Sequence, residues 1–212
     1  MAERLFDQMT RGLKTLGIQV ALAESLTDYV NLLHKWNKPY NLTAVRRPED
    51  MVIKHVLDSL TLVPYLSPYK RLCDVGTGAG LPGIPLAVCF PDKEFVLLDS
   101  NGKKTRFLYQ VRQQLKLNNV SIVEGRTETY QPEQGFDVVM SRAFADLNRM
   151  CHLTSHLLNA DGVWLAMKSQ TVDTEISELS TSVEISEQID LVVPGLEERR
   201  QLVVLRRDEN KK

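Results

Sequence analysis

The sequence has few of the features that mark exported, metal-binding or membrane proteins. Its three cysteines, Cys73, Cys89 and Cys151, are odd in number and lack the spacing of metal ligands, which argues against a disulfide framework or a zinc site. No apolar run approaches the ~18 residues of a membrane span, and the amino terminus is charged throughout. We therefore expect a monomeric protein of the reducing cytoplasm, without membrane or metal partners.

The chain also lacks an excess of charge of either sign. Its 212 residues have a formal net charge of -1 at pH 7, unlike the strongly basic chains of many nucleic-acid binders. Charge is instead separated along the chain, because residues 100–126 hold six basic residues and one acid, whereas residues 171–190 hold six acids and no base. The basic segment is compatible with phosphate contacts, although a charged helix face is more commonly only solvated.

What is present indicates one globular domain, since 43% of the residues are hydrophobic and 25% are charged. Residues 1–70 have the periodicity of helices. One apolar stripe in this region is formed by Leu26, Tyr29, Val30, Leu33 and Trp36. We expect the helix that carries this stripe to end at Pro39, and a second helix to run from about Pro48 to Pro64.

From residue 71 onwards, short β-rich runs alternate with helical segments. The runs are RLCDVG, EFVLLDS, VSIVEGR, FDVVMSR and GVWLAMK, and their alternation with helices predicts a parallel sheet that is covered on both faces. Residues 183–194 and 200–207 are two further strand-like runs, joined by GLEER, and they predict an antiparallel hairpin. We therefore predict a helical cap over residues 1–70, as one place for RNA contact, and an α/β domain over residues 71–212.

Residues 72–88, LCDVGTGAGLPGIPLAV, place a glycine-rich turn between the first predicted strand and its helix. Doubly wound sheets bind ligands at this position. The stretch GAGLPG matches the G-x-G-x-x-G pattern of dinucleotide-binding proteins, and Asp99 follows at the end of the next strand. A NAD-binding oxidoreductase is therefore one alternative.

Two features of the turn favour a different ligand. The charge of Asp74 would repel a diphosphate and attract a cation. Pro82 and Pro85 remove N–H groups from the helix start that could otherwise bind phosphate. S-adenosylmethionine, a cationic adenosine ligand without phosphate, meets these conditions, and Asp99 lies where its ribose would present hydroxyls. The structural alternatives are that Asp74 accepts hydrogen bonds from the loop and that Asp99 caps the next helix.

Five blocks of the sequence resemble, in order, the bacterial glucose-inhibited division protein B family. They are LLHKWNKPYNLT, HVLDSL, DVGTGAGLPGIPLA, LLDSNGKKTRFL and SRAFADL. The resemblance implies a Rossmann-like methyltransferase sheet of seven strands that uses S-adenosylmethionine, with a helical extension at the amino terminus. It also implies methyl transfer to N7 of a guanine at about nucleotide 527, in the decoding-centre hairpin of 16S rRNA in the small ribosomal subunit, where a loop base can be splayed out.

Matching positions carry the family's binding residues onto this sequence. The resemblance implies that Gly76, Gly78 and Leu81 line the methionine and adenosine side, that Asp99 and Ser100 face the ribose, that Thr127 and Glu128 flank the adenine, and that Arg142 closes the site. Asp74 joins this set of cofactor-binding candidates through its charge.

Methyl transfer from a sulfonium needs a nucleophile aligned with the methyl group and little else. Guanine N7 has a lone pair and no proton, so it needs no general base. We therefore expect catalysis by proximity and orientation, with Arg142 as the catalytic candidate that holds the guanine or the cofactor. The structural alternative for Arg142 is a surface salt bridge to Asp137 or Asp146. A noncatalytic RNA-binding assembly protein that retains the cofactor loop is the remaining functional alternative.

Some aromatic and basic residues are further candidates for RNA contact. Phe144 could stack on an extruded base or belong to the core. Lys35 and Lys38 alternate with Trp36 and Tyr40, although Trp36 also lies on the apolar stripe. His34 and His55 are equally compatible with structural roles.

Overall fold

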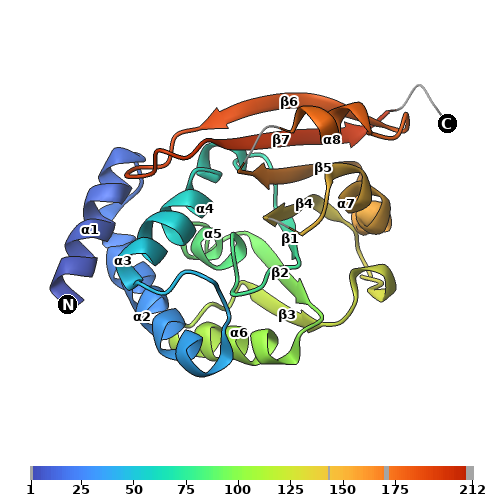
Figure 1. Ribbon diagram of the computed structural model, residues 1–212. Coiled ribbons are helices and arrows are strands. Elements are labelled where there is room, and N and C mark those ends of the chain that lie inside the picture. The colour runs from blue at the N-terminus through green and yellow to red at the C-terminus, as the bar shows by residue number, and fades with distance from the viewer. Residues whose placement is uncertain (1, 143, 170–171, 209–212) are drawn as a thin grey trace.

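The computed structural model describes residues 2–142, 144–169 and 172–208, and within them a seven-stranded sheet of order β3-β2-β1-β4-β5-β7-β6 (Figure 1). The strands are β1 Arg71–Val75, β2 Glu94–Asp99, β3 Val120–Glu124, β4 Phe136–Arg142, β5 Leu158–Lys168, β6 Val183–Leu191 and β7 Arg200–Arg207. The first five pair in parallel, whereas β7 pairs antiparallel with both β5 and β6. The predicted parallel sheet and its closing hairpin are therefore confirmed.

Helices cover this sheet on both faces. They are α1 Ala2–Thr15, α2 Ala23–Tyr40, α3 Pro48–Met51, α4 Asp58–Leu60, α5 Gly83–Cys89, α6 Gly102–Gln114, α7 Leu147–Thr154 and α8 Asp173–Ser177, with a π-helical segment, η2 Val52–Leu57, between α3 and α4. Short 3-10 turns lie at η1 Val20–Leu22, η3 Val63–Tyr65, η4 Thr127–Thr129 and η5 Ser155–Leu157. No helix in the described ranges is long and apolar enough to cross a bilayer.

Two apolar clusters flank the sheet because successive side chains of a strand point to opposite faces. In β2, Phe95 and Leu97 join the cluster that contains α1, α2, α5 and α6, whereas Val96 and Leu98 join the cluster that contains α7. Leu72 of β1 belongs to the first cluster. The helices of residues 2–66 thus pack into the same core as the sheet.

The helical region differs from the prediction in two places. Helix α2 continues through Pro39 and ends at Tyr40, where Asn41 adopts a left-handed conformation. The segment predicted as one helix from Pro48 to Pro64 is broken by η2. Side chains compete there for backbone carbonyls, because Arg142 donates to the carbonyl of Lys54, and such insertions distort a helical ladder.

The helical region also contacts the glycine-rich loop directly. Tyr29 of α2 is fully buried, and its hydroxyl donates to the carbonyl of Ala79 at 2.8 Å. The predicted apolar stripe of α2 is buried or half-buried along its length, and Trp36 packs against Phe107 of α6 with ring centroids 5.8 Å apart. A domain boundary near residue 70 stays a prediction, although β1 begins at Arg71.

Candidate cofactor-binding site

The loop between β1 and α5 is shaped by glycines in a left-handed conformation. Gly76 and Gly78 have φ values of +64° and +62°, which favour glycine because it has no Cβ. A Cβ on Gly76 would collide with the ring of Phe144. The loop backbone therefore passes directly against this aromatic ring, and a larger residue at position 76 would have no room.

Asp74 holds this loop in place through its carboxylate. Its side chain is fully buried, and Oδ2 accepts hydrogen bonds from the Thr77 hydroxyl at 2.6 Å and from the Gly83 amide at 2.8 Å. Burial raises the pKa of Asp74 to about 7, so its charge is only partly present at neutral pH. The anchoring alternative is confirmed, and this acid repels a diphosphate less than the sequence argument assumes; contact between Asp74 and a cofactor stays a prediction.

The start of α5 offers no donor for a phosphate. The Gly83 amide donates to Asp74, the Ile84 amide donates to the carbonyl of Gly80 at 2.7 Å, and Pro85 has no N–H. The next amide, of Leu86, bonds within the turn. Phosphates bind helix starts through free N–H groups, so this helix start is unsuited to the diphosphate of a dinucleotide.

Asp99 is the acid at the carboxyl end of β2, and it is only 6% exposed. Its Oδ2 accepts a hydrogen bond from the Gly78 amide at 2.9 Å, and its Oδ1 accepts one from the Asn101 amide at 2.9 Å. Lys104 Nζ lies 3.6 Å from Oδ2. The carboxylate is thus fixed between the glycine loop and the first turn of α6, while Asn101 rather than Asp99 caps that helix.

A pocket of about 380 Å³ opens beside this carboxylate, at the carboxyl ends of the central strands. Its size is within the usual range of small-molecule sites, roughly 300–1,000 Å³. Five of the residues predicted from the sequence line it together: Gly76, Asp99, Ser100, Thr127 and Glu128. Lys104, Arg126, Phe144 and Arg149 complete much of the remaining wall.

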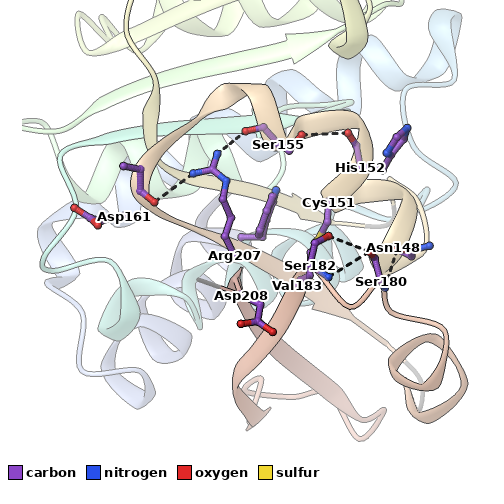
Figure 2. Close-up of a pocket in the computed structure, with 12 residues that line it drawn as sticks. Asn148, Cys151, His152, Ser155, Asp161, Ser180, Ser182, Val183, Arg207 and Asp208 are labelled. Atoms are coloured by element: carbon purple, nitrogen blue, oxygen red, sulfur yellow. Dashed lines mark hydrogen bonds between the residues drawn. The ribbon is translucent and has the colours of Figure 1, made fainter. Parts of the chain in front are cut away.

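A larger hollow of about 670 Å³ lies elsewhere, between α7, the start of β5 and the hairpin (Figure 2). Figure 2 shows Arg207 reaching toward Ser155 across this hollow. The guanidinium donates to four backbone carbonyls, those of Ser155, Leu158, Asn159 and Ala160. Arg207 therefore stabilises the chain around η5, and the hollow contains neither the glycine loop nor the end of a parallel strand, where α/β sheets bind ligands.

Comparison with known proteins is decisive for the family. The family described as GidB, rRNA small subunit methyltransferase G, matches residues 22–203. The chain belongs to this family. It is 54% identical over 182 residues to the ribosomal RNA small subunit methyltransferase G of Shewanella denitrificans, covering 86% of this chain and 87% of that protein. It is 47% identical over 210 residues to the same enzyme of Ectopseudomonas mendocina, covering 98% of each.

Solved structures with much lower identity share the fold of this GidB-family chain. A SAM-dependent methyltransferase from Thiobacillus denitrificans, in complex with S-adenosyl-L-homocysteine, is 13% identical with a TM-score of 0.51, covering 71% of this chain and 91% of its own. The N-methyltransferase NodS from Bradyrhizobium japonicum is 14% identical with a TM-score of 0.53, covering 72% and 94%. The predicted α/β methyltransferase fold is therefore confirmed.

Four predicted site residues of this GidB-family chain do not line the pocket: Asp74, described above, and Gly78, Leu81 and Arg142. Leu81 is 4% exposed and packs into the apolar core. Gly78 contributes its amide to Asp99. Arg142 extends from the end of β4 toward η2, where it donates to the carbonyl of Lys54 at 2.8 Å and to Asp58 Oδ2 at 3.2 Å.

The salt-bridge alternative for Arg142 named the wrong acids. Asp137 accepts hydrogen bonds from the backbone amides of Lys70 and Arg71, and Asp146 caps α7. The acid that Arg142 contacts is Asp58, which lies 84 residues earlier in the chain and was not singled out. The contact forms because the end of β4 and the helical segment before β1 meet on one side of the sheet.

Asp58 is the centre of a buried ionic cluster. Its side chain is 3% exposed, with Arg142 at 3.2 Å from Oδ2 and Arg200 Nε at 3.3 Å from Oδ1. Burial raises the pKa of Asp58, and the two arginines oppose that effect. His55 lies beside Arg142, its Nε2 is 2.7 Å from the Thr43 hydroxyl, and burial lowers its pKa to about 4. His55 is therefore neutral at pH 7 and has protein partners on both ring nitrogens.

The sequence argument missed the role of Lys104 beside the pocket and left the role of Lys168 open. Lys104 was counted only as part of a basic segment, although its position in the first turn of α6 brings it back to Asp99. Lys168, at the end of β5, donates to the carbonyl of Ala145 at 2.9 Å and to Glu175 Oε2 at 2.7 Å. Lys168 thus holds the loop after β4 in place beside Phe144.

Two further features concern groups of metal-ligating side chains and the cysteine thiols. Within the described ranges, no group of three or more His, Cys, Asp or Glu side chains is placed to hold a metal ion. Cys73 and Cys151 are free and buried, and burial raises the pKa of Cys151 to about 12. A thiol of this kind is a poor nucleophile at neutral pH.

Asp74→Asn is expected to flatten the dependence of folding stability on pH. The fold raises the pKa of Asp74 from 3.8 to about 7, so its contribution to stability is full below pH 3.8 and is lost as the pH rises through about 7. Asparagine cannot ionise, yet its Oδ1 can accept the bonds from Thr77 and Gly83. Urea unfolding at about pH 5 and about pH 8 should show a smaller difference in the free energy of unfolding for the variant.

Asp92→Asn is the matched control for this experiment, because Asp92 is exposed in the loop after α5. It should leave the difference between the two pH values as in the wild type. Identical differences in wild type and Asp74→Asn would show that Asp74 keeps an ordinary pKa.

Proposed function

We propose that this protein transfers a methyl group from S-adenosylmethionine to N7 of a guanine in 16S rRNA of the small ribosomal subunit. The observation that carries this proposal is a pocket at the carboxyl ends of β1 to β3, built around Asp99, in a chain that is 54% identical to a ribosomal RNA small subunit methyltransferase. Carboxyl ends of parallel strands are where such sheets bind their ligands. The nucleotide, the monomeric state and the cytoplasmic location stay predictions.

The residues of the pocket fit the adenosine part of this cofactor. Asp99 and Ser100 would hold the ribose hydroxyls, while Thr127 and Glu128 would flank the adenine. Gly76 would let the chain approach the ligand closely. The bound cofactor supplies an electrophilic methyl group on a sulfonium. The NAD alternative is disfavoured by the start of α5, because its amides are already used within the protein.

Positioning is the remaining task of the protein, because guanine N7 needs no base. Phe144 lines the pocket and contacts Gly76, so it would offer a ring on which an extruded guanine can stack. Arg142 remains our candidate for holding the guanine or the cofactor. Its guanidinium has five N–H donors, and three contacts to Lys54, Asp58 and His55 leave donors for a ligand.

The direct test is methyl transfer to small ribosomal subunits that lack the modification, followed by mapping of the methylated nucleotide. We expect S-adenosylmethionine-dependent labelling of a single guanine, with the methyl group on N7. A label on an exocyclic amine or a ribose would contradict the N7 assignment. Calorimetry separates the alternatives, because a protein that binds NADH but not S-adenosylmethionine would be an oxidoreductase, and one that binds RNA but not the cofactor would be an assembly protein.

A further inference from the structure

The exposed face of α6 carries a row of basic side chains without acidic neighbours on the helix. Lys103, Arg106, Tyr109 and Arg112 are all exposed and follow one another at three-residue spacing, so they lie on adjacent turns. Lys116, also exposed, continues the row just beyond the helix. Helix α6 contains no Asp or Glu. We call these five residues the α6 row.

The basic members of the α6 row form no ion pair with any residue that the structure describes. Arginine and lysine on a protein surface commonly pair with nearby carboxylates, whereas here four cations stay available to an outside partner. Lys104, on the inner side of the same helix, is instead close to Asp99. The unpaired charge is therefore confined to the outer face.

Tyr109 adds an aromatic surface to this row. The residue is 49% exposed, and its hydroxyl donates to the carbonyl of Ile122 at 3.2 Å, which fixes the ring on the surface. A surface hollow of about 460 Å³ lies beside it, lined among others by Arg112 and Lys116. Exposed aromatic rings between cations are typical of surfaces that bind single-stranded nucleic acid.

The α6 row begins at the cofactor pocket. Helix α6 starts at Gly102, three residues after Asp99, and its 13 residues extend about 20 Å from that point. Arg126, which follows β3, lines the same pocket. A strand whose extruded base stacks on Phe144, at the wall of the cofactor pocket, could therefore continue along the row.

Acidic residues gather at the other edge of the sheet. Strand β3 forms the edge next to α6, whereas β6, with Glu184, Glu187 and Asp190, forms the opposite edge (Figure 1). Asp190 is paired with Arg199, and β7 places Arg200, Arg206 and Arg207 next to β6, so much of this acidic charge is compensated. The cations of α6 are not compensated in this way and would attract a polyanion. The α6 side therefore favours the approach of RNA without any contact to its bases.

We propose that the α6 row binds the phosphates of the rRNA strand that flanks the target nucleotide. This inference rests on the proposed function and adds to it the surface that holds the substrate. Contacts of this kind fix the register of the RNA on the protein and carry little sequence information. They neutralise phosphates and release counterions, so binding depends steeply on salt.

The test is a variant in which Lys103, Arg106, Arg112 and Lys116 are all changed to Gln. Its affinity for small subunits lacking the modification is measured over a series of salt concentrations. Each phosphate contact on a single strand contributes ~0.7 to the slope of log Kd against log salt, so the loss of four contacts should reduce this slope by about 2–3. The KM for subunits should rise about tenfold near 0.1 M salt. The Kd for S-adenosylmethionine should stay within twofold of the wild-type value.

A matched control removes four exposed cations far from the pocket. Arg4, Arg11 and Lys14 of α1, together with Lys70, are changed to Gln, which alters the net charge by the same amount. This variant should keep the wild-type salt slope. If both variants lose slope equally, the effect is one of net charge and the α6 row is not a binding surface.

A photocrosslinker at position 109 distinguishes RNA from protein as the partner. Benzoylphenylalanine in place of Tyr109, irradiated on the small subunit, should form its crosslink to rRNA. A crosslink to a ribosomal protein, or an unchanged salt slope in the α6-row variant, would overturn the inference. Either result leaves the proposed function intact as long as the wild-type protein methylates the subunit, whereas absence of methylation by the wild type would contradict the proposed function itself.

Discussion

Asp58→Ala is expected to lower the free energy of unfolding by about 3 kcal/mol, near the lower end of the range for breaking a buried ion pair. The carboxylate is the shared partner of Arg142 and Arg200, and its removal leaves two guanidinium groups without it in a largely buried region. The loss stays near the lower end because the arginine side chains are 22% and 13% exposed and reach water. Urea unfolding at neutral pH measures the change.

Asp28→Ala is the matched control for this loss, since Asp28 lies exposed on α2. Surface changes of this kind are usually within about 0.5 kcal/mol. A double-mutant cycle that combines Asp58→Ala with Arg200→Gln should show that the two changes are not additive, because the residues are in contact. An Asp58→Ala protein as stable as the wild type would mean that the cluster contributes nothing to folding.

Asp99→Ala is expected to weaken S-adenosylmethionine binding about 5- to 150-fold, as for the loss of a charge-assisted hydrogen bond, ~1–3 kcal/mol. Two effects act together. The ribose would lose its acceptor, and the amides of Gly78 and Asn101 would lose the carboxylate that fixes the glycine loop. Calorimetric titration gives the Kd directly.

Asp99→Asn separates these two effects. An amide side chain offers one acceptor oxygen instead of two, so it can satisfy only one of the two backbone amides while keeping the side-chain volume. We expect it to bind the cofactor more weakly than the wild type and to unfold at a lower urea concentration. Asp92→Ala, in the exposed loop after α5, should match the wild type in both measurements. Unchanged affinity in Asp99→Ala would remove this residue from the site.

The fold could be predicted because its strands are local in sequence. RLCDVG, EFVLLDS and VSIVEGR each place apolar residues within a short run, and β1, β2 and β3 fall inside them. The π-helical η2 could not be predicted in this way. The carbonyl of Lys54 is contacted from outside the helix by Arg142 of β4, and helical periodicity carries no information about such a distant donor.

The same distinction between local and distant contacts applies to the residues of the site. Asp99, Ser100 and Thr127 could be placed near one another because they lie at or just after the ends of the neighbouring parallel strands β2 and β3, and they line one pocket. Arg142 also lies at the end of such a strand, but the direction of its side chain depends on Asp58, a partner that no local pattern reveals. The sequence also could not show that Asp74 is buried, and its raised pKa comes mainly from that burial.

The hydrogen bond from Tyr29 to the carbonyl of Ala79 makes the amino-terminal helices part of the ligand pocket's scaffold. A truncated protein that begins at residue 71 would lack Tyr29, whose buried phenol supports the glycine-rich turn. Loss of its ring would leave a cavity next to that turn. The helical region and the sheet therefore depend on each other at this turn. Changes in α2 that shift Tyr29 should therefore weaken the affinity for the nucleoside ligand more than the affinity for RNA.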